Sequence, residues 1–245
     1  MIKATYNFEN KLKFYEQIKQ IDIAVPLRSR GRKKDEVERY SIVSFLLNIL
    51  EKNLISFPMK IVHRNKPDFL IETQTCKIGI EVSEVIPEQL ARAEAILEKQ
   101  FPNGMLELEF FRLDAPNRNN SAINEILYKT NKGNENEAKL IGSGLAGHIV
   151  EENWVRGIIG SIYSKTKKMN KVGFDKFQNN WLVLYDNQAS ISLNYAYAGV
   201  KLEPYLIEYK KSNSGVKFGN AFILSGNSFF HLDLIHLNFK QTLLI

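Results

Sequence analysis

Two acidic residues, Asp68 and Glu81, are spaced so that their side chains could meet on neighbouring strands. If the segment between them is an antiparallel hairpin with a two-residue loop at Gln74-Thr75, Asp68 lies directly opposite Glu81. Side chains alternate along a strand, so both acids share one face with Ser83. The opposite face is uniformly apolar and consists of Phe69, Ile71, Ile78, Ile80 and Val82.

This apolar face fixes the register of the hairpin, because a slip by one residue would bury the acids. Two like charges directly opposite each other repel. A divalent cation between them would remove that cost, and Mg²⁺ commonly takes one or two carboxylates together with waters and a substrate phosphate. Asp68 and Glu81 are therefore predicted to hold Mg²⁺ or Mn²⁺. The alternatives are a bulge that breaks the pairing and a solvated hairpin face. Gly79, opposite Leu70, is expected to leave the acidic face uncrowded.

The apolar spacing also predicts the elements around the hairpin. A helix is expected to start at about Asp35, and strands are expected over 59–63, 68–72 and 78–85. Pro87 then opens an Ala/Glu-rich helix. A further strand is expected over 105–112. The order is α-β-β-β-α-β over a core at about 35–112.

The rest of the chain is predicted to be a loop followed by a C-terminal extension. Residues 116–139 are polar and rich in asparagine, which is typical of a long mobile loop. A helix over 151–171, a buried strand over 181–185 and a strand-rich remainder ending in a hairpin are expected to form a helix and β-rich extension at about 145–245. No linker interrupts the chain, so residues 1–245 are interpreted as one α/β domain.

At these residues the chain resembles the PD-(D/E)xK nuclease superfamily, which has the restriction-endonuclease-like fold. Pro67-Asp68 is similar to the first half of its motif, Glu81-Val82-Ser83 is similar to the second half, and the order of elements is similar to its common core. The resemblance implies a mixed central sheet and a Mg²⁺- or Mn²⁺-dependent endonuclease, a hydrolase of phosphodiester bonds in nucleic acid. It also implies the main-chain carbonyl of Val82 as a third metal ligand.

One departure from the family motif concerns the catalytic lysine, which is replaced here by Ser83. In the family that lysine positions or activates the attacking water. Lys165, on the flank of a helical apolar stripe, is the preferred substitute, whereas Lys168 lies farther from that stripe; Ser83 could also orient the nucleophile through a water. Family members often carry an acid on the first helix, which makes Glu38 a candidate accessory ligand. The alternative for Lys165 is a lysine that only covers apolar surface. The alternative for Glu38 is an ordinary surface glutamate.

The net charge of +6 and the pI near 9.2 permit a polyanionic partner. Five cations lie within seven residues, and they are predicted to contact nucleic-acid phosphates: Arg28, Arg30, Arg32, Lys33 and Lys34. A solvated loop is the alternative. DNA is favoured over RNA as the partner, and cleavage of both duplex strands would favour a homodimer. The competing hypothesis is a degenerate member of the fold that binds nucleic acid or protein without cleaving.

The single cysteine, Cys76, excludes an intrachain disulfide and fits a reducing compartment. The N-terminus lacks the apolar region of a signal peptide, and no apolar run is long enough to span a bilayer. The expected location is therefore the cytoplasm, with no membrane partner.

Overall fold

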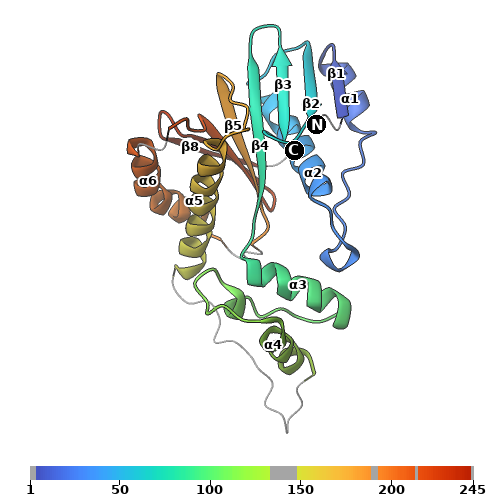
Figure 1. Cartoon of the computed structure of the whole chain (residues 1–245), viewed down its shortest axis with the longest axis vertical. Helices are drawn as coiled ribbons and strands as arrows, with labels where there is room; N and C mark the ends of the chain where they lie inside the picture. The colour runs from blue at the N-terminus through green and yellow to red at the C-terminus, as the bar shows by residue number, and fades with distance from the viewer. Residues whose placement is uncertain (1–3, 133–147, 189–192, 213–214, 244–245) are drawn as a thin grey trace.

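The computed structural model describes residues 4–132, 148–188, 193–212 and 215–243. Within them, one eight-stranded sheet runs in the order β1 to β8, and helices pack on both of its faces (Figure 1). The strands are β1 (Ala4–Phe8), β2 (Met59–His63), β3 (Phe69–Thr73), β4 (Lys77–Val85), β5 (Asn179–Asp186), β6 (Asn220–Ser225), β7 (Ser228–Asp233) and β8 (Asn238–Leu243). The helices are α1 (Lys11–Ile18), α2 (Lys34–Glu51), α3 (Glu88–Gln100), α4 (Asn120–Lys132), α5 (Ile149–Met169) and α6 (Tyr195–Lys211), with short 3₁₀ helices η1 (Arg28–Arg30) and η2 (Leu108–Phe111).

The sheet is mixed. Strands β1 to β4 form an antiparallel meander, β4 to β6 are parallel, and β6 to β8 are again antiparallel. The parallel centre explains the apolar run from Trp181 to Leu184 in β5, since a parallel strand is covered on both faces. Each parallel pair is joined by a helical crossover, as this arrangement requires.

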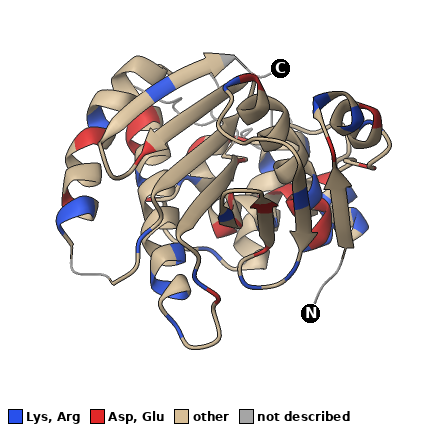
Figure 2. Ribbon diagram, turned by 90° about the horizontal axis from the view of Figure 1, so that it is seen from above, with Lys and Arg blue, Asp and Glu red and all other residues tan. Residues whose placement is uncertain are grey.

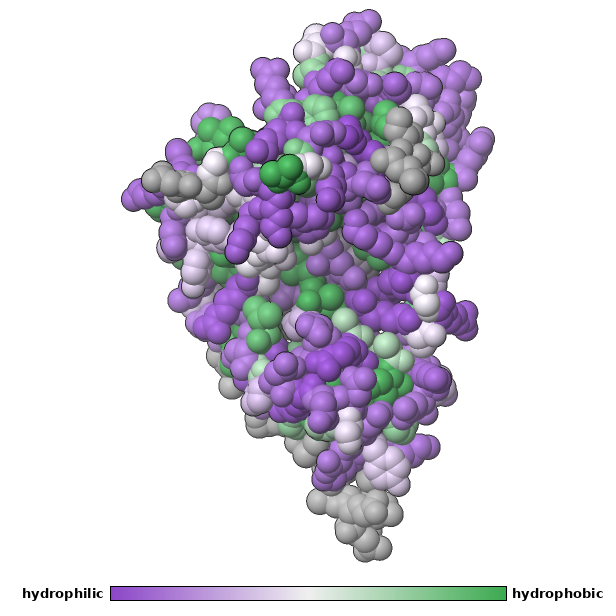
Figure 3. Space-filling model, viewed as in Figure 1, coloured by the Kyte–Doolittle hydropathy of each residue, from purple (hydrophilic) through white to green (hydrophobic). Residues whose placement is uncertain are grey.

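Three clusters of buried side chains hold these elements together. The helix α2 covers one face of the sheet through residues such as Phe45 and Ile49, and α5 and α6 cover the other face. The third cluster joins α3, η2 and α4 through Leu90, Phe111 and Leu127. This small helical unit extends away from the sheet beyond the end of β4 (Figure 1). The face of the molecule in Figure 3 is largely hydrophilic, with only small scattered apolar areas.

Most of the predicted elements are confirmed. The helices over α2, α3 and α5, the strands β2, β3, β4 and β5, and the hairpin of β6 and β7 lie where the apolar spacing indicates. The α/β class and the mixed sheet are confirmed as well. None of the helices among the described residues has both the length and the apolar character that crossing a membrane requires.

Three predictions are wrong. The expected strand over 105–112 is the 3₁₀ helix η2, because its apolar side chains pack against α3 and α4 and have no strand beside them. The expected loop over 116–139 contains α4, which is anchored by buried Ile123 and Leu127; residues 133–139 lie outside the described residues. The C-terminal region is less β-rich than expected, because α6 follows β5 and packs on the sheet.

Candidate active site

The hairpin of β3 and β4 has the predicted register. Leu70 pairs with Gly79, and the ladder runs as far as Phe69 opposite Ile80, the chain neighbours of Asp68 and Glu81. The Gln74-Thr75 loop is stabilised by Thr73, whose hydroxyl accepts a hydrogen bond from the Cys76 amide at 3.1 Å. This side-chain bond substitutes for the glycine that two-residue hairpin loops usually need.

One expectation about the acidic face is wrong. A Cβ atom on Gly79 would lie 2.6 Å from the Phe177 ring and 3.1 Å from Pro67, so this part of the face is crowded. Glycine is required there because Phe177 and Pro67 pack directly over the backbone.

Asp68 and Glu81 are both fully buried, with no exposed surface. Asp68 Oδ2 accepts a hydrogen bond from the Val82 amide at 2.8 Å, which ties the first acid to the strand that carries the second. Burial raises the pKa of Asp68 to about 6, and the negative charges of Glu81 and Glu38 add to this effect. The acids are thus close enough to repel each other, as the pairing predicted.

Lys34 links Asp68 to the first long helix. Its ammonium lies 2.9 Å from Asp68 Oδ1 and also pairs with Glu38, which lies one turn along α2. Burial opposes the charge on Lys34, but the hydrogen bonds to Glu38 and Asp68 outweigh it and raise the pKa. Glu38 is buried and contacts His63 Nε2 at 2.7 Å through its other oxygen. The accessory acid predicted on the first helix therefore lies beside the hairpin acids.

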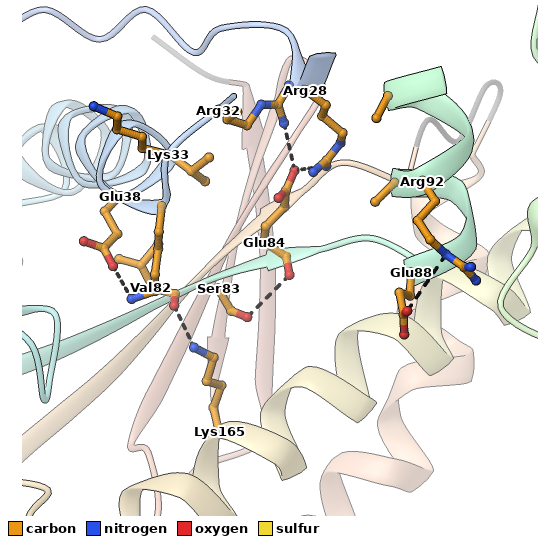
Figure 4. A pocket seen from close by; sticks show the side chains of 14 residues that line it. Arg28, Arg32, Lys33, Glu38, Val82, Ser83, Glu84, Glu88, Arg92 and Lys165 are labelled. Carbon is orange, nitrogen blue, oxygen red and sulfur yellow. Dashed lines mark hydrogen bonds and ion pairs between the residues drawn. The ribbon is translucent and has the colours of Figure 1, made fainter. Parts of the chain in front are cut away.

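Two lysines of α5 reach Glu81. Lys165 Nζ donates to Glu81 Oε1 at 2.9 Å and to the Val82 carbonyl at 3.0 Å, and Figure 4 shows it pointing from its helix toward that carbonyl. Lys168, the poorer candidate from the sequence, lies 2.7 Å from the same Glu81 oxygen. The two lysines are three residues apart and hence on one side of the helix. Both reach the acid, although only Lys165 contacts the carbonyl.

The second carboxylate oxygen of Glu81 differs from the first in its hydrogen bonding. Glu81 Oε2 is buried and has no hydrogen-bond partner among the described residues. A buried charged oxygen without a partner is costly. Glu81, Asp68 and the Val82 carbonyl all offer oxygen atoms, the donor type that Mg²⁺ and Mn²⁺ prefer. The residues present therefore fit a divalent cation.

A second group of metal-ligating side chains adjoins the first. Asp35, Glu38 and His63 each offer one ligand atom, and these atoms lie within 4.8 Å of one another. Asp35 and His63 were not identified from the sequence. The helical spacing of Asp35 and Glu38, together with the pairing of His63 with Phe69, is the signal that could have found them.

Part of the basic tract pairs with acidic residues of the protein, and part of it is exposed. Arg28 and Arg32 both pair with Glu84, at 2.5 and 3.1 Å, and Arg28 also pairs with Glu94 at 2.7 Å. Gly31, with a φ of 75°, ends the short helix η1 in the left-handed conformation that glycine allows. Of the five predicted phosphate contacts, Arg28, Arg32 and Lys34 have acidic partners within the protein. The remaining two, Arg30 and Lys33, are exposed.

A cavity of about 520 Å³ lies beside this cluster, and the buried Asp68 and Glu81 are not among the residues that line it. Val82, Glu38, Lys34 and Lys165 line it, and Ser83 and Glu84 continue the same wall (Figure 4). The Ser83 hydroxyl donates to the Glu84 carbonyl at 3.4 Å. Elsewhere, lysine and arginine are distributed over many elements and do not gather on one face (Figure 2).

Comparison of the chain with models of known families, with curated proteins and with solved structures gives no match.

Proposed function

We propose that this chain is a metal-dependent nuclease with a restriction-endonuclease-like core, which hydrolyses phosphodiester bonds of nucleic acid. The observation that carries the proposal is the buried Glu81 carboxylate, whose Oε2 has no hydrogen-bond partner among the described residues. Its other oxygen contacts Lys165, which also contacts the Val82 carbonyl, and the Val82 amide donates to Asp68. Such an arrangement is costly for a protein that binds no cation.

Asp68, Glu81 and the Val82 carbonyl would hold Mg²⁺ or Mn²⁺. When bound, the ion supplies a water of lowered pKa and stabilises negative charge on the phosphate. Asp35, Glu38 and His63 form an adjacent donor set that could take a second ion or tune the first.

Lys165 would perform the role of the missing motif lysine. Its two contacts, with Glu81 Oε1 and the Val82 carbonyl, hold the ammonium beside the proposed ligands and at the wall of the cavity. From there it can orient the attacking water and offset the charge that develops on the phosphate. Ser83 lines the same cavity and can hold a water, but it cannot supply a charge.

The test is cleavage of plasmid DNA and of RNA in the presence of Mg²⁺ or Mn²⁺. We expect that Asp68→Ala and Glu81→Ala each abolish cleavage. Glu72→Ala is the matched control, because Glu72 lies on the same hairpin and pairs with Lys77 at 2.9 Å, away from the cavity. Cleavage that survives both substitutions would refute the proposal.

A second candidate function is binding without cleavage. It is favoured by Ser83 in the motif position and by the internal neutralisation of the acids, in which Lys34 pairs with Asp68 and Lys168 with Glu81. Such a module would bind DNA or RNA without metal, with an affinity that falls steeply as salt rises. As the nucleic-acid partner we propose DNA rather than RNA. We propose that the chain acts as a homodimer only if both strands of a duplex are cut.

A further inference from the structure

We infer that Asp35, Glu38 and His63 bind one divalent transition-metal ion, such as Zn²⁺ or Co²⁺, and that this ion displaces the ammonium of Lys34 from Glu38. None of the three ligands belongs to the set proposed for the catalytic ion, so the inference does not depend on cleavage. It follows from the spacing of the three side chains, from the nitrogen donor among them and from the lysine that already contacts one of them.

The fold brings the three side chains together from two elements. Asp35 and Glu38 are three residues apart in the first two turns of α2, so they lie on one side of the helix. His63 ends β2 and pairs with Phe69 of β3. Its ring stacks on Phe69, with centroids 4.3 Å apart and planes 14° from parallel, and Nε2 lies 2.7 Å from Glu38 Oε2. The imidazole is therefore held with one nitrogen at the acid.

The spacing of the donors suits a single ion. One ligand atom from each of the three residues lies within 4.8 Å of the other two. Oxygen and nitrogen ligands about 2.1 Å from one Zn²⁺ ion can be at most about 4.2 Å apart, so small side-chain rotations would close the set. Two carboxylates at this distance repel each other. An ion between them would remove that cost.

The donor types select the class of ion. Glu38 and His63 are buried, and Asp35 is half-buried. Carboxylates alone suit Mg²⁺ and Ca²⁺, whereas imidazole favours transition metals. Two carboxylates and one imidazole also leave coordination positions for water. The set therefore fits Zn²⁺ or Co²⁺ better than Mg²⁺, unlike the oxygen ligands proposed for the catalytic ion.

A cation of the protein already contacts this group. The ammonium of Lys34 pairs with Glu38 and lies 2.9 Å from Asp68 Oδ1, so one positive charge is shared by two buried carboxylates. The lysine side chain is 61% exposed, whereas the side chains of the two acids are 2% and 0% exposed. Lys34 can therefore swing into solvent while the acids stay in place. This movement opens a route for an ion from the adjoining cavity, which Lys34 and Glu38 line.

The experiment titrates Co²⁺ into the untagged, chelator-treated chain in the presence of excess Mg²⁺. We expect Co²⁺ to bind in spite of the Mg²⁺ and to give one strongly shifted imidazole resonance in the proton NMR spectrum, as a histidine bound to paramagnetic Co²⁺ does. Zn²⁺ should displace the Co²⁺ and abolish that resonance. Displacement of Co²⁺ by Mg²⁺, or the absence of a shifted imidazole resonance, would overturn the inference.

Substitutions then assign the ligands. His63→Gln should lower the Co²⁺ affinity by about 100-fold or more and remove the shifted resonance, since even the loss of a residue behind a ligand costs about 10–100-fold. Asp35→Asn, at the half-buried start of α2, should lower the affinity by about tenfold or more with less risk to folding. His236→Gln is the matched control, because His236 is exposed in the turn between β7 and β8 and pairs with Asp233. Urea unfolding in EDTA identifies the folded variants. Wild-type affinity in folded His63→Gln or Asp35→Asn, or an equal loss in His236→Gln, would refute the assignment.

Lys34 provides a separate test. Because its ammonium and the ion would repel each other, Lys34→Gln should raise the Co²⁺ affinity by about tenfold. Lys33→Gln is the matched control, because it removes a charge from the preceding exposed residue and should change the affinity by about twofold or less. An equal rise in both variants, or no rise in Lys34→Gln, would show that the ion does not displace the lysine and would overturn that part of the inference.

The inference and the proposed function can fail separately. If His63-dependent Co²⁺ binding is found and neither plasmid DNA nor RNA is cleaved, the proposed function fails and the inference holds. If nucleic acid is cleaved in Mg²⁺ and His63→Gln binds Co²⁺ as the wild type does, the inference fails and the proposed function holds. Asp68→Asn, which removes a ligand of the proposed catalytic ion, should keep the shifted imidazole resonance. Its loss there would show that the two ions share one site and would overturn the inference.

Discussion

Asp68→Asn should make the metal-free protein more stable at neutral pH, although it removes a proposed metal ligand. Burial and the neighbouring acids raise the pKa of Asp68 from 3.8 to about 6. The folded chain therefore retains a proton that the unfolded chain has lost as pH rises from about 4 to 6. Over this interval the free energy of unfolding of the wild-type protein falls, by about 3 kcal/mol in total for a shift of this size.

Asparagine has the same shape and does not ionise. Its side-chain oxygen can still accept the hydrogen bond from the Val82 amide, and Lys34 retains its pair with Glu38. The raised pKa already includes the favourable contact with Lys34, so about 3 kcal/mol is an upper bound for the gain above pH 6. Below pH 4 both side chains are neutral, and the two proteins should differ least.

The assay is urea unfolding in EDTA between pH 4 and 8, repeated in Mn²⁺. The stability difference between Asp68→Asn and wild type should grow with pH in EDTA and shrink or reverse in Mn²⁺, because the ion stabilises only the protein that binds it. Asp22→Asn is the control, since exposed Asp22 accepts the Ala24 amide in a way that asparagine can reproduce. A difference that is independent of pH, or an Asp68→Asn protein that is the less stable one at pH 8 in EDTA, would refute this reasoning.

Three further predictions test other parts of the structure. Lys165→Gln should lower the cleavage rate by about 100-fold or more, and Lys168→Gln should lower it less, because Lys165 alone also contacts the Val82 carbonyl; equal losses in single-turnover rates would contradict this. His63→Gln should lower cleavage in Mn²⁺ more than in Mg²⁺, since imidazole favours transition metals; an unchanged ratio of the two metal-dependent rates would argue against a role for His63. Gly79→Ala should cost about 1–3 kcal/mol in urea unfolding, because its methyl group would collide with the Phe177 ring; a neutral effect would show that the ring moves aside freely.

The hairpin was predictable because one of its faces is uniformly apolar. Phe69, Ile71, Ile78 and Ile80 can only point into the core, and that alone fixes which residue lies opposite Asp68. The position of Lys165 was predictable for a similar reason. The apolar stripe of α5 fixes the side of the helix that meets the sheet, and the lysine lies on the flank of that stripe.

The wrong predictions concern segments whose partners are distant in the sequence or few in number. Two buried residues, Ile123 and Leu127, suffice to pack α4 against a small cluster, but they are too sparse to stand out in a polar segment. Arg28 and Arg32 look solvated in a basic tract because Glu84 and Glu94 come more than fifty residues later. Contacts of that kind depend on the assembled fold and leave no local pattern.

Under the proposed function, Ser83 stands where the nuclease motif has a lysine, and this is consistent with the geometry of the site. Glu81 faces α5, so lysines on that helix can meet it from across the interface, and Lys165 does so while also contacting the Val82 carbonyl. The charge beside the acids is therefore present without a lysine at position 83 of β4. Position 83 lines the cavity of about 520 Å³ and a second cavity of about 230 Å³ between the end of β4 and α5, and a long side chain there would project into their junction. A small residue at position 83 and a lysine on the neighbouring helix are thus two parts of one arrangement, which leaves the junction of the two cavities open and keeps a cation beside the acid.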